Sequence, residues 1–254
     1  MLHRLFPAAF LIVTCVVATS TLSRAGQLSF NIDPAQSHIT LTLETADGTQ
    51  IISSPQTPGS DTTSLSGTLN ADVTASTIQF LTTDNLQFGL QAVSQSPLID
   101  GTTGSSPAQY GLNVDIAGVG GGVVAARNYV ADVTSGVIPV SAGAFDATKL
   151  VLTLTPGSIS SYNLTFFGST AAGFFTGSNP GNNALSNGTL TQVGGLETLT
   201  ASVSVVAPTT VEGVTFLGVF TGQIVATATV PEPASVLLAG LAVGTLWLFR
   251  RRGV

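Results

Sequence analysis

The sequence Leu-Thr-Ala-Ser-Val-Ser-Val at residues 199–205 alternates strictly between apolar and hydroxyl-bearing side chains. In an extended strand, successive side chains point to opposite faces, so this stretch predicts one face on a core and one face in water. Threonine suits the solvent face because its branched β-carbon fits a pleated sheet. The stretch therefore predicts a half-buried β-strand.

The same alternation recurs along the chain. It is found at residues 39–43, 78–80, 86–90, 150–154 and 224–230. Turn-forming residues separate these runs, at Asp47-Gly48, 53–60, Asp100-Gly101, Gly120-Gly121-Gly122, 178–183 and Gly194-Gly195. No long stretch between them combines a helical period with good helix formers. The prediction is an all-β fold, an antiparallel sandwich or barrel, and the sequence leaves both architectures open.

The N-terminus has the parts of a secretory signal peptide. His3 and Arg4 give a positive start, a mostly apolar run follows, and Ser23 and Ala25 have the spacing that signal peptidase prefers. We expect signal peptidase to cleave before Gly26, with cleavage after Ala18 or Ser20 as the alternative. Residues 1–25 are then a signal peptide, and residues 26–230 are a single exported all-β ectodomain.

The C-terminal segment, residues 231–254, has three ordered parts. A Pro-Glu-Pro sequence is followed by sixteen uncharged residues, 234–249, and then by three arginines at 250–252. Arginine costs about 2.5–3.5 kcal/mol at the centre of a bilayer, so the arginines should stop on the cytoplasmic side of the inner membrane. A sixteen-residue helix is about 24 Å long, against roughly 30 Å for the hydrocarbon core. A membrane helix over 234–249 is therefore short for a permanent span and sufficient for a tail that is later removed.

This order of parts resembles the PEP-CTERM sorting signal of Gram-negative bacteria. The residues that carry the resemblance are Val230, Pro231, Glu232, Pro233, Ala234, Arg250, Arg251 and Arg252. The resemblance implies processing by an exosortase, a membrane enzyme that removes the tail. It also implies delivery to the cell surface or to an extracellular matrix that contains exopolysaccharide. A permanent membrane anchor is the alternative.

Charge and cysteine content restrict the partners of residues 26–230. The basic residues of this region are Arg127 and Lys149, against twelve acidic residues, which gives a net charge of −10. Proteins bind phosphate backbones through Lys and Arg, so we expect no nucleic-acid partner. The region contains no cysteine, so neither a disulfide nor a thiolate metal site supports the fold.

One histidine, His38, is available for catalysis in residues 26–230. It lies on the polar side of the alternation at 39–43, which predicts an exposed strand side chain. A serine triad or a zinc site would need more than this residue offers. The glycine-rich run at 118–122 is not followed by Lys and Ser or Thr, so it predicts a loop and no phosphate-binding site.

Carboxylates are the remaining candidates, because two of them suffice for glycoside hydrolysis. The glutamates are Glu44, Glu197 and Glu212. No spacing marks a pair among them, and we expect all three to be solvated surface acids. The sequence thus predicts no catalytic, metal or cofactor site, and we expect that the protein is not an enzyme.

Residues 30–39 are similar to the opening strand of YceI-like proteins, periplasmic β-barrels that hold isoprenoid lipids. Gln36 stands where that pattern usually has histidine. The likeness keeps a second interpretation open, a ligand-binding β domain for carbohydrate or an apolar lipid. Outward aromatic rings near Tyr162 would favour sugar binding, and a deep apolar cavity would favour lipid. The leading hypothesis is an exported, non-catalytic surface or extracellular-matrix protein.

Overall fold

The computed structural model describes residues 25–45, 51–81, 86–91, 96–97, 103–104, 108–118, 120–127, 129–154, 159–166, 169–176, 187–211 and 214–230. These residues are nearly all in β-strands, as predicted. The elements are β1 (Ala25–Ile32), β2 (His38–Thr45), β3 (Ile51–Pro55), β4 (Thr62–Ser66), β5 (Thr68–Thr74), β6 (Thr77–Phe80), β7 (Leu86–Phe88), β8 (Ser96–Pro97), β9 (Thr103–Gly104), β10 (Tyr110–Ile116), β11 (Gly120–Arg127), β12 (Val130–Thr134), β13 (Ile138–Ser141), β14 (Ala144–Asp146), the 3₁₀ turn η1 (Ala147–Lys149), β15 (Val151–Leu154), β16 (Ile159–Phe166), β17 (Ser169–Thr176), β18 (Asn187–Val193), β19 (Leu196–Val211) and β20 (Val214–Thr229).

Eight antiparallel strands form a closed barrel. Their order is β1-β5-β6-β13-β14-β18-β19-β20, and pairing of β20 with β1 closes the ring. Asn31 pairs with Thr227 and Ile32 with Ala226 at this closure. Eight strands enclose a space that side chains can just fill. Of the two architectures that the sequence left open, the structure has the barrel.

The long strand β20 also carries a second set of strands. One edge of its 16 residues pairs with β19. The other edge pairs with β1 near its C-terminal end and with β2 along residues 216–223. From β2 the sheet continues through β4, β7, β12 and β15. We call these five strands, β2 included, the branch. Both sets of strands therefore depend on one strand.

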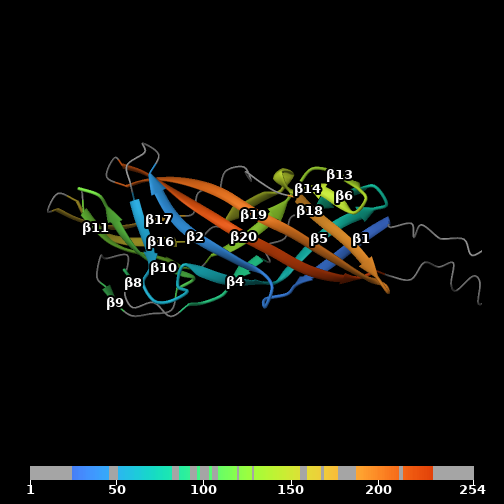
Figure 1. Ribbon diagram of the computed structural model, residues 1–254, viewed down its shortest axis with the longest axis horizontal. Helices are drawn as coiled ribbons and strands as arrows, with labels where there is room; N and C mark the ends of the chain where they lie inside the picture. The colour runs from blue at the N-terminus through green and yellow to red at the C-terminus, as the bar shows by residue number, and fades with distance from the viewer. Residues whose placement is uncertain are drawn as a thin grey trace, which may run out of the picture.

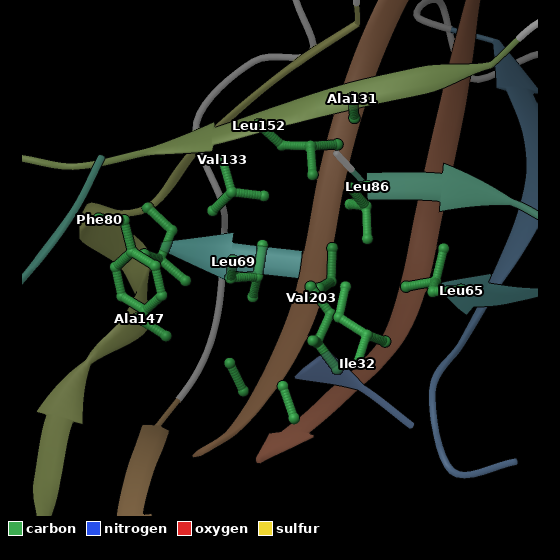
Figure 2. Close-up of a cluster of buried hydrophobic side chains, with 14 of the residues drawn as sticks. Ile32, Leu65, Leu69, Phe80, Leu86, Ala131, Val133, Ala147, Leu152 and Val203 are labelled. Carbon is green, nitrogen blue, oxygen red and sulfur yellow. The ribbon is translucent and has the colours of Figure 1, made fainter. Parts of the chain in front are cut away.

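The barrel and the branch share one hydrophobic core. Figure 2 shows Leu86 and Leu152 of the branch pointing into the same space as Leu69 and Val203 of the barrel. Since buried apolar area is the main favourable term in folding, this shared core joins the two parts energetically.

A separate five-stranded sheet, β17-β16-β11-β10-β3, lies at the opposite end of the elongated molecule from β1 and β18 (Figure 1). The hydroxyl of Tyr110, on β10, donates a hydrogen bond to the carbonyl oxygen of Ile39, on β2, at 3.3 Å. This contact ties the separate sheet to the branch.

The predicted alternation holds along several strands. On β19, Leu199, Ala201, Val203 and Val205 are all buried. Ile39 on β2 is fully buried, and Ile78 on β6 likewise. Leu90 differs, because it was expected on the core face with Leu86 and Phe88 and is instead 65% exposed. The reason is that β7 ends at Phe88, so the alternation of side chains stops there.

The predicted loop at Gly118 to Gly122 is wrong over most of its length. Ala117 and Gly118 lie in a turn, whereas Gly120 to Gly122 begin strand β11 and pair with β10. A Cβ on Gly121 would meet the carbonyl oxygen of Val114. Glycine is needed there because the two backbones approach closely, which is a recognised use of glycine within strands.

The predicted targeting segments lie almost entirely outside the described residues. Strand β1 begins at Ala25, one residue before the predicted cleavage site. The signal helix and the C-terminal hydrophobic helix fall in residues 1–24 and 231–254, which are not among the residues described. Within the described ranges, the structure contains no helix with the length and apolarity needed to cross a membrane.

Candidate functional site: the terminal end of the barrel

The start of β1, the end of β20 and the turn between β18 and β19 lie at one end of the barrel, which we call the terminal end (Figure 1). Thr229, the last residue of β20, pairs with Leu196, the first residue of β19. Beyond it, the backbone N–H of Val230 donates to the carbonyl oxygen of Gly195 at 2.8 Å. The chain is therefore held on the barrel up to the residue before Pro231.

The β18–β19 turn consists of Gly194 and Gly195, as the sequence predicted. Their φ angles are 58° and 81°, so both residues have left-handed backbone conformations. This is the pattern of a type I′ turn, whose twist matches that of the flanking strands and which favours glycine. The flanking residues, Val193 and Leu196, form a cross-strand pair and are 79% and 42% exposed. The sequence identified the turn but not this exposed apolar pair.

The structure places one residue of the predicted sorting signal. Val230 is half-buried at the end of β20 and packs against the core. Pro231, Glu232, Pro233 and Ala234 lie outside the described residues, as do the arginines at 250–252. What the structure establishes is the starting point of the segment, directly at the barrel.

His38 is exposed on β2, as predicted. It is preceded by a corner, residues 33–37, that fixes β1 and β2 onto β20. Ser37 is buried, with 1% of its surface exposed. Its hydroxyl donates a hydrogen bond to the carbonyl oxygen of Val225 at 3.0 Å and accepts one from the Val225 N–H at 2.9 Å. The Gln36 side chain and the Ala35 N–H donate to the Asp33 carboxylate and lower the pKa of that group. These residues form a structural corner of the fold.

Two of the three glutamates, Glu44 and Glu197, are among the described residues, and they lie far apart, because Glu44 pairs with Leu217 on β20 and Glu197 with Ala228. Glu44 is exposed, as expected. Glu197 was expected on the surface and is fully buried instead. Glu197 lies two residues before Leu199 on β19, so both side chains point into the barrel; the alternation of the strand carried this signal, whereas the spacing between the glutamates did not. Glu212 is outside the described residues. Over the part of the chain that the structure covers, no three His, Cys, Asp or Glu side chains gather as metal ligands would.

Four aromatic rings gather where the branch meets the separate sheet. They belong to Phe88, Tyr110, Tyr129 and Phe220, with centroid separations from 5.9 to 6.4 Å. Tyr110 and Tyr129 are buried, so neither offers a ring to a sugar. Burial, and next the neighbouring Tyr129, raise the pKa of Tyr110 well above its usual value. The side chains of Tyr162, Phe166 and Phe174 are not among those that the structure describes.

Comparison with protein families identifies the C-terminal segment. Residues 229–252 match the PEP-CTERM protein-sorting motif. The chain thus carries an exported β-barrel followed by a PEP-CTERM signal, which implies sorting through the membrane and processing by an exosortase-type enzyme. A search of curated proteins found no match, and a search of solved structures found none either.

Proposed function

We propose that this protein is a non-catalytic component of the cell surface or extracellular matrix, delivered by its signal peptide and its PEP-CTERM segment and associated with exopolysaccharide. The observation that carries the proposal is the direct continuation of a closed, filled barrel into the matched motif, which begins on the last residue of β20. In this proposal, residues 234–249 enter the inner membrane first, and an exosortase then removes the tail.

The packing of the barrel supports a structural role. Fully buried side chains such as Phe30, Ile78 and Leu199 point inward from strands all around the ring. Such a barrel presents its outer faces and its ends to partners. The described residues supply no observation in favour of a lipid cavity, and no comparison supports the YceI-like alternative.

The outer face over β18, β19 and β20 is rich in hydroxyl groups. Its exposed residues include Thr189, Thr191, Ser202, Thr221 and Thr229. Each hydroxyl both donates and accepts hydrogen bonds, as the hydroxyls of a polysaccharide do. We assign contact with exopolysaccharide to this face, which we call the hydroxyl face.

The processing step is tested by the intact mass of the protein recovered from its native host, with its C-terminal peptide sequenced. Trypsin would cut residues 26–230 only after Arg127 and Lys149, so another protease is needed. A C-terminus between Pro231 and Ala234 would support removal of the tail. An intact end at Val254 in membrane fractions would contradict it and establish a permanent anchor.

The matrix role is tested by cosedimentation of the full chain with exopolysaccharide from the same host. We expect the triple variant Thr191→Ala, Ser202→Ala, Thr221→Ala to bind more weakly, because hydroxyls are lost from the hydroxyl face. The control carries Ser54→Ala, on β3 of the separate sheet, and Ser76→Ala, in the turn between β5 and β6, both at exposed positions away from that face. Equal binding by both variants would rule out the hydroxyl face.

A further inference from the structure

The Val193–Leu196 pair is an apolar feature at the edge of a polar surface. Val193 follows Thr191 on the outer side of β18, and the next pair on the same face of the hairpin is Thr191 with Thr198. The exposed fractions, 79% for Val193 and 42% for Leu196, leave both side chains available at the terminal end. The type I′ turn between them holds the pair in a fixed position, so contact with a partner requires little ordering.

The chain leaves the barrel next to this pair. Val230 is hydrogen-bonded to Gly195, and the uncharged segment begins at Ala234. Four residue steps span at most about 14 Å when fully extended. The headgroup layer is roughly 6 Å thick on each side of the hydrocarbon core. If residues 234–249 are in the bilayer, the turn is therefore held near the lipid surface.

The short length of the apolar segment acts in the same direction. At about 24 Å it falls short of a hydrocarbon core of roughly 30 Å. The arginines at 250–252 resist entry from the cytoplasmic side, so the shortfall draws the opposite end, and the barrel with it, towards the lipid.

We propose that the β18–β19 turn docks into the outer surface of the inner membrane, with Val193 and Leu196 entering the interfacial layer while the sorting segment is inserted. The proposal rests on the membrane insertion in the proposed function and adds a second contact of the barrel with lipid. Docking would hold the start of the segment, and thus the Pro-Glu-Pro sequence, at the membrane surface.

The charges near the turn fit zwitterionic lipid. Residues 193–196 carry no charge, and Glu197 points into the barrel. Asp72, exposed on β5, lies three strands around the ring from β19. At about 4.8 Å per strand this is roughly 14 Å along the wall. Apolar contact is therefore the expected source of binding, as for interfacial segments that bury an apolar face.

The absence of cysteine from residues 26–230 makes a site-specific test possible. The chain from Gly26 to Val254, which is the form left by the expected signal-peptide cleavage, contains no cysteine. It is labelled at Val193→Cys with an environment-sensitive fluorophore and reconstituted into phosphatidylcholine vesicles. We expect a blue-shifted emission and an intensity reduced about twofold when the lipids are brominated near the headgroups, since interfacial groups lie 5–10 Å deep.

Ile52→Cys is the matched control, because Ile52 is 55% exposed. The hydroxyl of the neighbouring Ser53 accepts a hydrogen bond from the N–H of Leu43 on β2. Leu43 pairs with Gly218, which lies eleven residues before Thr229 along β20. At 3.3 Å per residue this places the control roughly 36 Å from the terminal end. We expect its emission to be unchanged by brominated lipid.

Flotation of the vesicles separates the two hypotheses. If the chain floats and the label at position 193 behaves like the label at position 52, docking is overturned while insertion stands. A blue shift without quenching by brominated lipid would also overturn docking, because the turn would then be covered by protein, from a second copy or from the chain itself. A chain that does not float refutes the insertion on which docking depends.

Discussion

At the scale of single residues, Ser37 is the most consequential polar side chain of the corner between β1 and β2. Its hydroxyl bonds both backbone groups of Val225 in a buried position. We expect Ser37→Ala to lower the free energy of unfolding by about 2 kcal/mol, because two buried backbone groups lose a partner. Urea unfolding followed by circular dichroism measures the change.

Ser29→Ala is the control for this prediction. The Ser29 hydroxyl also makes a hydrogen bond, to the Asn70 side chain at 2.6 Å, but it is exposed. Surface substitutions of this kind usually change stability by less than about 0.5 kcal/mol. If the two variants unfold alike, burial is not what gives Ser37 its importance.

Tyr110 gives the fold a sensitivity to alkaline pH. Its pKa is raised well above 10.0 in the folded protein, because burial disfavours the charged phenolate. In the unfolded chain this tyrosine loses its proton near pH 10, so stability is complete below that pH and falls as the pH rises towards the folded-state pKa. The expected slope is about 1.4 kcal/mol per pH unit.

Tyr110→Phe tests this origin, because it keeps the ring and removes the ionisable group. We expect the variant to lose less stability between about pH 9 and pH 11 than the native protein does. The midpoint of urea unfolding at each pH gives the comparison. An identical slope in both proteins would assign the alkaline sensitivity to other groups.

The residue scale also shows where sequence reasoning stops. Alternation placed Leu199 and Ile39 correctly, because burial of one strand face is a local property of the sequence. Glu197 shares the parity of Leu199, yet its charge indicated a surface position. Whether a charged residue can be buried at the end of a barrel depends on its neighbours on strands distant in sequence. Strand alternation alone does not identify those neighbours.

At the scale of elements, the crossing of β2 and β20 depends on Gly222. A Cβ at this position would meet the carbonyl oxygen of His38 and approach the Ile39 Cα to 2.8 Å. Both contacts are with backbone, which cannot move without separating the strands. We expect Gly222→Ala to destabilise the protein by about 1–3 kcal/mol, the usual cost of overpacking.

Gly136→Ala provides the comparison, because a Cβ there meets nothing within 4 Å. Its effect on the urea midpoint should be small. A Gly222→Ala variant as stable as Gly136→Ala would show that β2 and β20 have room to separate at little cost.

The sequence predicted where strands occur better than it predicted which strands pair with each other. Gly194-Gly195 was correctly predicted as a turn, because two adjacent glycines favour a tight hairpin. Gly120 to Gly122 are also adjacent glycines, yet they lie in strand β11, where a Cβ on Gly121 would meet the backbone of β10. The sequence also gave no sign that β20 pairs with both β1 and β2 along one edge. That arrangement is a long-range property.

At the scale of the whole molecule, the barrel and the branch should unfold together. They share β20 and one core, so neither retains its packing when the other is lost. We expect residues 26–230 to unfold in a single calorimetric transition with equal calorimetric and van't Hoff enthalpies. Two resolved transitions would contradict the single ectodomain predicted from the sequence.

The closure of β20 on β1 has a consequence for the timing of folding. The ring joins its first strand to its last, so the barrel cannot close until the end of the chain has been released on the far side of the membrane. Contacts so distant in sequence form slowly, because loop-closure entropy must be overcome first. Closure of the barrel is therefore expected to be a late step of folding, which follows the release of β20.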